Sequence, residues 1–509
     1  MTITESDQKK EIVHAFMKIV HSFLKYIQIF LYLLKSNKLP VKNIKFNHRF
    51  ILGITLVSAM GGLLFGYDWV VIGGAKPFYE RFFDITGSPY LQGWAMSSAL
   101  IGCLVGAMIS GYFSDRYGRK LPLIAAAALF TIAAIGTGSV NQFTPFIIYR
   151  LIGGVGIGLA SAISPMYIAE ISPASMRGRL VSINQLTIVI GILGAQIVNY
   201  LIAEKIPAGA TDEFILNSWN SQQGWRWMFW AGTVPAVLFF VFSFFIPESP
   251  RFLAKSGKWK EADAILERIG GTQYAAQEQK EMAETLHDSD SKIDWKALSS
   301  KGIRPVLILG IVLAVFQQWC GINVIFNYAE EIFTSAGYSV GDMLFNIVIT
   351  GTVNLVFTFL AMRMVDSWGR RKLMLLGAAG LAVIYFLLGG SYFFEVKGLA
   401  ILVLVMLAIA TYSMTLAPIT WVILSEIFPN KIRGAAMSIA TTALWVACFV
   451  LTYTFPILNK LLNASGTFWL YGFICLSGFL FVLKNLPETK GKSLEEVEEF
   501  FDKKYKNIK

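Results

Sequence analysis

Charged residues are scarce in this chain of 509 residues, since Asp, Glu, Lys and Arg together make up 15% of it. A soluble chain carries about 25%. By contrast, 55% of this sequence is hydrophobic and its mean hydropathy is +0.56. One aqueous core cannot hide so much apolar surface, so lipid must surround most of the chain. The shortage of charge therefore disfavours a soluble enzyme, a disordered protein and a fibre.

Cysteine and histidine are equally rare, with four residues of each. The cysteines all lie in apolar runs without disulfide or metal-ligand spacing, and we interpret them as buried and reduced. The histidines lie outside those runs, and no nucleophile is accompanied by a base. We therefore expect no enzymatic activity, no metal and no cofactor. The excess of 44 Lys and Arg over 33 Asp and Glu is typical of basic cytoplasmic loops, and the basic soluble domain that nucleic-acid binding needs is missing.

Long apolar runs take the place of the missing charges. A bilayer core needs about 20 apolar residues per helix. The sequence contains twelve such runs, at residues 50–76, 91–113, 121–140, 143–169, 179–204, 225–246, 304–334, 341–365, 371–393, 398–428, 433–461 and 466–485. Runs of this length without strict alternation predict helices rather than barrel strands. The expected fold is an all-α membrane protein with twelve transmembrane helices.

Lys and Arg are concentrated in alternate short loops, at 116–120, 177–179, 370–372 and 431–433. The positive-inside rule predicts that these loops are cytoplasmic, and with twelve spans both termini are cytoplasmic too. Residues 11–34 carry a polar stripe at helical spacing. This stripe favours an amphipathic helix in the membrane interface. A disordered start and a thirteenth span are the alternatives.

Short motifs occur twice in the chain. Residues 115–120 (DRYGRK) return as 366–371 (DSWGRR), residues 169–178 return as 425–434, and the Pro-Glu pair at 247–248 returns at 487–488. The chain thus contains two six-helix halves in the same orientation, which is an architecture of alternating-access transporters with a ligand site between the halves. The expected division is an N-terminal extension (1–49), a first half (50–246), a cytoplasmic linker with short helices (247–303), a second half (304–485) and a tail (486–509).

These motifs, together with PESPR at 247–251, QQxxGIN at 317–323 and PETKG at 487–491, resemble the sugar porter family of the major facilitator superfamily. The resemblance covers about residues 50–500 and is strongest to bacterial proton–sugar symporters of the xylose type, with animal facilitative glucose carriers as cousins. It implies a protein of the bacterial inner membrane that takes up a monosaccharide, hexose or pentose, together with a proton. It implies no cofactor, and we expect the monomer to be the functional unit.

Two charges fall inside the predicted spans at similar depths. With a helical rise of about 1.5 Å per residue, Asp68 lies roughly 12–14 Å below the outer face and Arg150 roughly 10 Å. An unpaired charge at such a depth costs at least ~2.5–3.5 kcal/mol, so the two are expected to pair. Proton coupling is the functional interpretation, because a conformational change that parts the pair would load or unload a proton; a permanent salt bridge is the alternative. The resemblance supports an Asp here in symporters, but it also places Gly232 where the xylose type has a Glu near this Arg.

Sugar binding inside a membrane requires neutral hydrogen-bonding side chains and aromatic faces. The seventh span offers Gln317, Gln318 and Asn323, and Gly321 between them permits a break in the helix. The other candidates, which the resemblance also assigns to sugar contact, are Gln185, Asn354, Trp421 and Trp445. The alternative is that the buried amides only join helices to one another. The identity of the sugar stays open, because Asn327, Ala417 and Leu444 depart from the pocket of the family.

Charged residues of the repeated motifs lie at the cytoplasmic ends of the spans. They are Asp115, Arg119, Glu170, Arg177, Glu248 and Arg251 in the first half and linker, and Asp366, Arg370, Glu426 and Arg433 in the second half. If they pair when the cytoplasmic gate is closed, they stabilise the outward-open state. The alternative is a set of ordinary surface pairs worth ~0–1 kcal/mol each.

Three functions are therefore compatible with the sequence. A proton-coupled monosaccharide importer is favoured, and a uniporter of the same fold differs from it in whether Asp68 titrates during transport. A sugar sensor without transport activity is disfavoured, because sensors of this fold tend to have long cytoplasmic tails and this tail extends about 20 residues beyond Pro487.

Overall fold

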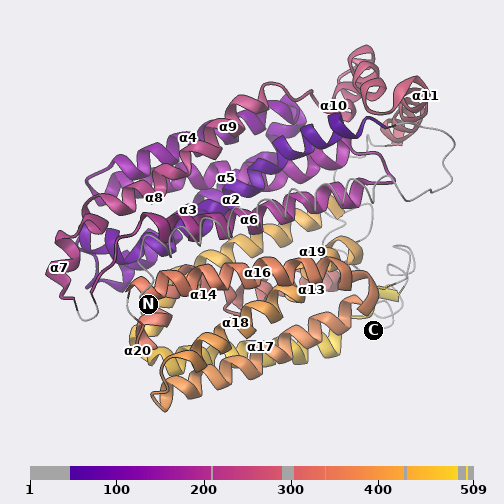
Figure 1. The fold of residues 1–509 in the computed structure, drawn as a ribbon. Helices are drawn as coiled ribbons and strands as arrows, with labels where there is room; N and C mark the ends of the chain where they lie inside the picture. Colours follow the sequence, from indigo (N-terminus) through magenta and orange to yellow (C-terminus); the bar gives the residue numbers. More distant parts are fainter. Residues whose placement is uncertain are drawn as a thin grey trace, which may run out of the picture.

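The computed structural model describes residues 46–207, 210–288, 303–338, 340–428, 433–490 and 500–501. Within these residues the regular structure is helical and contains no strand, and the helices form one bundle of long rods (Figure 1). Eleven helical stretches in this part of the chain are long and apolar enough to cross a membrane. The last of them, Ala435–Asn485, has 51 residues and contains a non-helical backbone at Asn463, so it makes two passages. The expected twelve-passage, all-α fold is confirmed.

The first six passages form the upper half of the bundle in Figure 1. Their elements are α2 (His48–Phe82), α3 (Pro89–Tyr117), α4 (Lys120–Ser139), α5 (Phe143–Ile171), α6 (Arg177–Ile202), and the sixth passage formed by η1 (Asn220–Gly224), α8 (Trp225–Ala231) and α9 (Thr233–Ser243). A short helix, α7 (Asp212–Asn217), lies in the connection before the sixth passage. Each of the first six predicted spans overlaps one of these passages.

The last six passages form the lower half. Their elements are α13 (Arg304–Trp319), α14 (Ile322–Asn327) and α15 (Ala329–Ser335) in the seventh passage, followed by α16 (Val340–Trp368), α17 (Arg370–Phe393), α18 (Leu399–Met414) with α19 (Leu416–Ile427), and α20 (Arg433–Asn485). The seventh passage is broken at Gly321, whose φ of 86° is a left-handed conformation that glycine adopts readily. The helix break expected at this glycine is therefore present.

The helices of the linker mark one end of the bundle. We call this the linker end and the opposite end, which carries α7, the far end (Figure 1). The linker helices are α10 (Pro250–Lys255) and α11 (Trp259–Asp288), and α11 is interrupted at Gly271. Leu266, Ile269 and Tyr274 of α11 share a buried cluster with residues of the first half, so α11 is docked on that half. The expected N-terminal helix at 11–34 and the tail from residue 491 to 499 lie outside the described residues.

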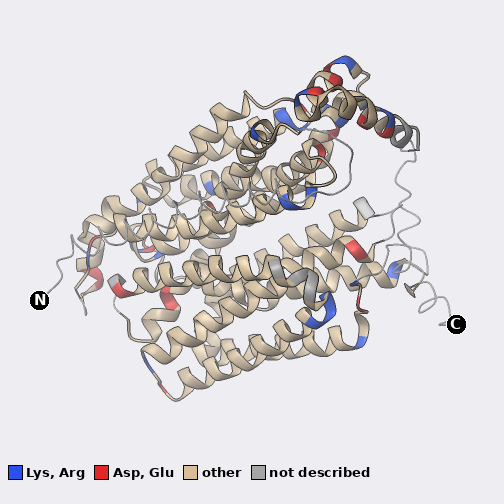
Figure 2. Ribbon diagram, turned by 45° about the vertical axis from the view of Figure 1, so that its right-hand side comes forward, with Lys and Arg blue, Asp and Glu red and all other residues tan. Residues whose placement is uncertain are grey.

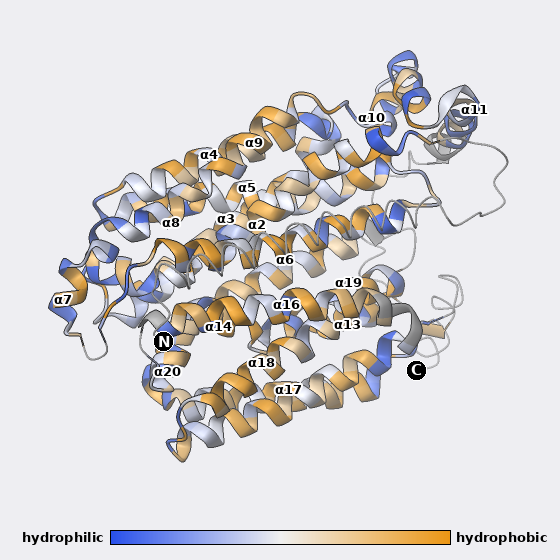
Figure 3. Ribbon diagram, in the orientation of Figure 1, coloured by the Kyte–Doolittle hydropathy of each residue, from blue (hydrophilic) through white to orange (hydrophobic). Residues whose placement is uncertain are grey.

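The outside of the bundle is apolar, and charged residues gather at its two ends. Figure 2 shows few charged residues along the middle of the helices, and Figure 3 shows hydrophobic residues over the same length. Large side chains such as Val234, Val383 and Phe473 are exposed there. Such a surface is suited to lipid and not to water. The four cysteines are buried and free.

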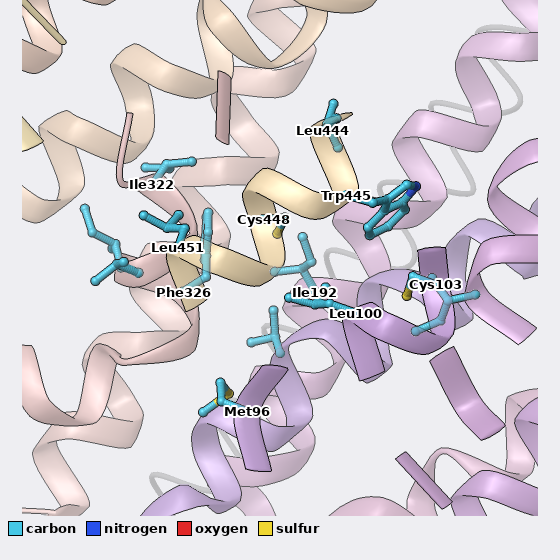
Figure 4. Packing of buried hydrophobic residues seen from close by; sticks show 14 of the residues in the cluster. Met96, Leu100, Cys103, Ile192, Ile322, Phe326, Leu444, Trp445, Cys448 and Leu451 are labelled. Atoms are coloured by element: carbon cyan, nitrogen blue, oxygen red, sulfur yellow. The ribbon is translucent and has the colours of Figure 1, made fainter. Parts of the chain in front are cut away.

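The two halves contact each other through the middle and the far-end part of their helices. Gly93 of α3 lies beneath the backbone carbonyl of Tyr453 of α20, and Leu193 of α6 shares a buried cluster with Val348 of α16. Figure 4 shows α20, with Trp445 and Cys448, between α14 and α3. Toward the linker end the two halves diverge in Figure 1. The structure is therefore closed at the far end.

Candidate functional site

The two intramembrane charges singled out in the sequence form an ion pair. Arg150 Nη1 of α5 lies 2.6 Å from Asp68 Oδ1 of α2, and the side chains are 3% and 20% exposed. The second carboxylate oxygen of Asp68 and the Nε of Arg150 have no hydrogen-bond partner in the described part of the chain. Both residues line a small cavity together with Trp69, Met96 and Asn327. Because Asn327 belongs to α14, this cavity lies between the two halves.

The structure leaves little space for a side chain at position 232. The ring of Tyr67 occupies the space in front of it, so that a Cβ at Gly232 would lie 2.9 Å from Tyr67 Cε1. Tyr67 is held in place because its hydroxyl donates a hydrogen bond to the carbonyl of Met228 at 2.8 Å. A glutamate at position 232 would have to displace this ring. The carboxylate that the fold presents to Arg150 is that of Asp68.

The break at Gly321 brings three predicted sugar-contact residues into one hydrogen-bonded row. We call Gln317, Gln318 and Asn323 the amide row. Gln317 Nε2 donates to the hydroxyl of Tyr412 at 2.7 Å, and Gln318 Nε2 donates to Gln317 Oε1 at 2.6 Å. Asn323, beyond the break, donates to the Oε1 of Gln318. The six-residue separation would not place Gln317 and Asn323 on one face of a regular helix. All three amides are buried.

The remaining predicted contacts divide into two buried and two exposed residues. Asn354 Oδ1 accepts a hydrogen bond from the Ser413 hydroxyl at 2.7 Å and is buried. Trp445 is buried against Phe65 and Trp69 of the first half, at ring-centroid distances of 6.0 and 6.4 Å. Trp445 therefore lies next to the residue that follows Asp68 in the sequence.

Gln185 and Trp421 are exposed, and the exposure of Trp421 is 39%. Gln185 lies in the first half of α6, which starts at the linker end, and Trp421 lies near the middle of α19, which ends there. Their exposure matches the divergence of the two halves toward that end.

The repeated motifs build two equivalent ion-pair clusters at the linker end. In the first half, Arg119 pairs with Glu170 at 2.8 Å, and Glu248 accepts from the backbone N–H of Arg119 at 2.8 Å. Glu170 also accepts from the hydroxyl of Ser249. A carboxylate at these N–H groups stabilises the N-terminus of α4. A Cβ at Gly118 would lie 2.2 Å from Glu248 Oε2, which explains the glycine of the motif.

The second half repeats this arrangement. Arg370 pairs with Glu426 at 3.0 Å, the backbone N–H of Arg370 donates to Glu488 at 2.8 Å, and the hydroxyl of Thr489 donates to Glu426 at 2.6 Å. Gly369 stands in front of Glu488 as Gly118 stands in front of Glu248. In both halves these contacts join residues of the same half.

The other predicted gate residues are at the surface or outside the described part. Asp115 pairs with Lys255 at 3.4 Å, and both are more than half exposed. Arg177 and Arg251 are exposed. The side chains of Asp366 and Arg433 lie outside the described residues.

Several polar residues near the candidate site were missed by the sequence reasoning. Tyr412 and Cys448 contact the amide row, and no pattern in the sequence singles them out among the other residues of their spans. A cluster of charges at the far end, around Lys76, was also missed. The charges themselves are visible in the sequence, because Lys76 and Glu80 are four residues apart and the seventh predicted span contains two adjacent acids, Glu330 and Glu331, but no pattern links the two sets.

Comparison with models of known protein families assigns the chain to a family. The family described as "Sugar (and other) transporter" matches residues 54–501. The chain belongs to this family.

Its relatives include proteins named as proton symporters of sugars. The D-xylose-proton symporter of Escherichia coli is 39% identical over 490 residues, covering 90% of this chain and 97% of that protein. The arabinose-proton symporter of Bacillus subtilis is 39% identical over 455 residues, covering 89% of this chain and 96% of that protein. Both of these relatives are transporters and not enzymes.

A solved structure supports the same fold. The xylose transporter XylE from Escherichia coli in an inward open conformation matches with a TM-score of 0.77 and 38% identity, covering 88% of this chain and 99% of that chain. The chain therefore has the fold of the major facilitator superfamily and is an integral membrane protein.

Proposed function

We propose that the protein takes up a monosaccharide together with a proton by alternating access. The observation that carries this proposal is the buried pair of Asp68 and Arg150, which lines a cavity between the halves close to aromatic and amide side chains. The D-xylose and arabinose symporters among its relatives favour a hexose or pentose as substrate.

Sugar binding falls to the amide row and the tryptophans. Gln317, Gln318 and Asn323 hydrogen-bond to one another and to Tyr412 in the structure. Each amide has two donor hydrogens and two acceptor lone pairs, so the row can exchange these bonds for sugar hydroxyls. Trp445 offers an aromatic face about one helical turn before Cys448, which Asn323 contacts. Gln185 and Trp421 would reach the sugar when the linker end closes.

Proton coupling falls to Asp68. In the structure the guanidinium of Arg150 compensates the charge of the Asp68 carboxylate. A movement of α2 relative to α5 would leave the carboxylate buried without its partner, and it would then take up a proton. The Oδ2 of Asp68 is available to bind that proton, because it accepts no hydrogen bond from a described residue.

The orientation follows from the basic residues at the linker end. We place this end and both termini in the cytoplasm of a bacterium, with the bundle in the inner membrane and its apolar flank in contact with lipid. The far end then faces outward, and the conformation described above is open to the cytoplasm. The monomer contains both halves of the site and is proposed as the functional unit.

The test is uptake of labelled sugars into proteoliposomes with and without an imposed proton gradient. Wild-type protein should concentrate a pentose or hexose when the gradient is present. Asp68→Asn keeps the size of the side chain and mimics the protonated acid. It should abolish uphill uptake while sugar exchange between two loaded compartments persists.

A matched control is Asp212→Asn. Asp212 also pairs with an arginine, Arg81, at 2.8 Å, but its side chain is 86% exposed at the far end. This variant should transport like the wild type. Uphill uptake by Asp68→Asn, or wild-type uptake that ignores a protonophore, would contradict symport and leave the facilitative uniporter as the function. Absence of any transport by a folded, sugar-binding wild type would favour the sensor.

A further inference from the structure

The far end is held closed by a charged cluster that the transport mechanism does not use. Lys76 of α2 lies within ion-pair distance of three carboxylates: Glu80 at 3.2 Å, Glu330 at 3.0 Å and Glu331 at 2.9 Å. Glu80 is on the same helix, whereas Glu330 and Glu331 are on α15 of the other half. The cluster therefore joins the two halves directly.

The cluster is buried and its charges do not balance. The exposed fractions of the side chains are 3% for Lys76, 5% for Glu80, 15% for Glu330 and 20% for Glu331. One ammonium group against three carboxylates leaves a formal charge of −2 if all are ionised. Burying an uncompensated charge costs several kcal/mol, and a buried group avoids this cost by becoming neutral.

Of the three carboxylates, Glu80 has the negative charge that neighbouring donors compensate least. Its Oε2 accepts one hydrogen bond from the Nε2 of Gln92 at 3.2 Å and lies 3.2 Å from the Nζ of Lys76. Its Oε1 is buried and has no hydrogen-bond partner among the described residues. By contrast, Glu331 accepts from Asn459 of α20 at 3.1 Å. A proton on Glu80 would remove one negative charge at the oxygen that no donor stabilises.

The other groups around the cluster cannot neutralise it. Lys76 lies over the ring of Tyr328, at 5.9 Å from the centroid, and the buried Tyr79 precedes Glu80 in α2. Both tyrosines are neutral at ordinary pH. Arg150 is engaged by Asp68, and Arg81 by Asp212.

We infer that this cluster is a proton-binding site, which holds one proton on Glu80 while the far end is closed and releases it when that end opens. Opening separates Lys76 from Glu330 and Glu331 and hydrates all three carboxylates, so the ionised form of Glu80 no longer carries a burial cost. The proton comes from and returns to the same side. The site therefore makes the balance of conformations depend on the pH at the far end and does not add to the number of protons transported. This inference rests on the alternating-access function proposed above.

The test measures the far-end distance in the absence of sugar and of any gradient. Nitroxide spin labels on Thr86→Cys and Lys397→Cys would report on the two halves, because both positions are exposed and the four native cysteines are buried. Electron–electron distance measurements on the protein in lipid nanodiscs, from pH 5 to pH 8, give the populations of the closed and open far end.

The closed state binds the extra proton, so the closed population should fall as the pH rises. For one linked proton the open-to-closed ratio changes by at most about tenfold per pH unit. Glu80→Gln mimics the protonated acid and should keep the far end closed at every pH. Lys76→Gln removes the cation, so it should shift the transition in the opposite direction, with the far end more open at each pH. Glu213→Gln, an exposed acid of α7, should behave like the wild type.

Three results would overturn the inference. They are a wild-type distance distribution that does not change with pH, the same pH dependence in Glu80→Gln as in the wild type, and loss of the pH dependence in Asp68→Asn. The last result would assign the effect to the transport pair. Because the experiment uses neither sugar nor a gradient, a failure of the proposed sugar uptake would not by itself produce any of these results.

Discussion

Gly93 offers a way to shift the conformational balance by one methyl group. It lies on α3 at the far end, and a Cβ at this position would come within 2.4 Å of the backbone carbonyl oxygen of Tyr453 on α20. A backbone oxygen cannot swing away, so Gly93→Ala must push the two helices apart. Overpacking of this kind costs about 1–3 kcal/mol. Since the contact joins the two halves, the cost falls on the far-end-closed state and is absent when this end opens.

A penalty of 1–3 kcal/mol on one state changes the ratio of the two states by about 5- to 150-fold. We therefore expect Gly93→Ala to populate the open far end at a pH where the wild type is closed. The gain in helix propensity from glycine to alanine, up to about 1 kcal/mol, applies to both states and cancels.

The assay is the same spin-label distance measurement, at one fixed pH. Gly111→Ala is the matched control, because it lies on the same helix and has no atom within 4 Å of its added Cβ. The control should leave the distance unchanged. If Gly93→Ala also leaves the distance unchanged, the far-end contact between α3 and α20 does not limit the opening, and the reasoning from packing is refuted.

Two further predictions concern the amide row and the linker-end clusters. Gln317→Ala removes a side chain that we propose binds the sugar and that hydrogen-bonds to Tyr412 and Gln318. Losing hydrogen bonds at a buried site costs about 1.5 kcal/mol, so calorimetry should show sugar affinity lowered by about tenfold or more. An unchanged affinity would mean that Gln317 does not bind the sugar. Glu426→Gln should lower the stability measured by thermal unfolding by roughly 1 kcal/mol, because its charged bonds to Arg370 and Thr489 weaken, and Glu170→Gln in the repeated cluster should have a similar effect. If neither variant changes the stability, these partly buried pairs contribute nothing to it.

The architecture could be predicted because its signals are local. A bilayer imposes about 20 apolar residues on every helix that crosses it, so each span is visible in its own stretch of sequence. The repeated motifs were equally visible, and the structure gives their physical cause. Gly118 and Gly369 leave room for the carboxylates of Glu248 and Glu488, which bind the N-termini of α4 and α17. A backbone requirement of this kind fixes residue types at fixed spacing.

The pairing of Asp68 with Arg150 was also within reach of the sequence, because a helix has a constant rise and a buried charge needs a partner. The row of Gln317, Gln318 and Asn323 was only partly so. Their residue types suggested a polar site, but the left-handed Gly321 decides that Asn323 turns back toward Gln318.

The tertiary structure alone decided which end of the bundle is closed and which charges hold it there. Lys76 meets Glu330 and Glu331 across 254 and 255 positions in the chain, and no periodicity links such distant residues. The same sequence must also form the opposite conformation during transport, so no local pattern can specify one of the two. The conformation that the chain adopts depends on small free-energy differences from packing and charge contacts between the two halves. These contacts exist only once the helices lie side by side.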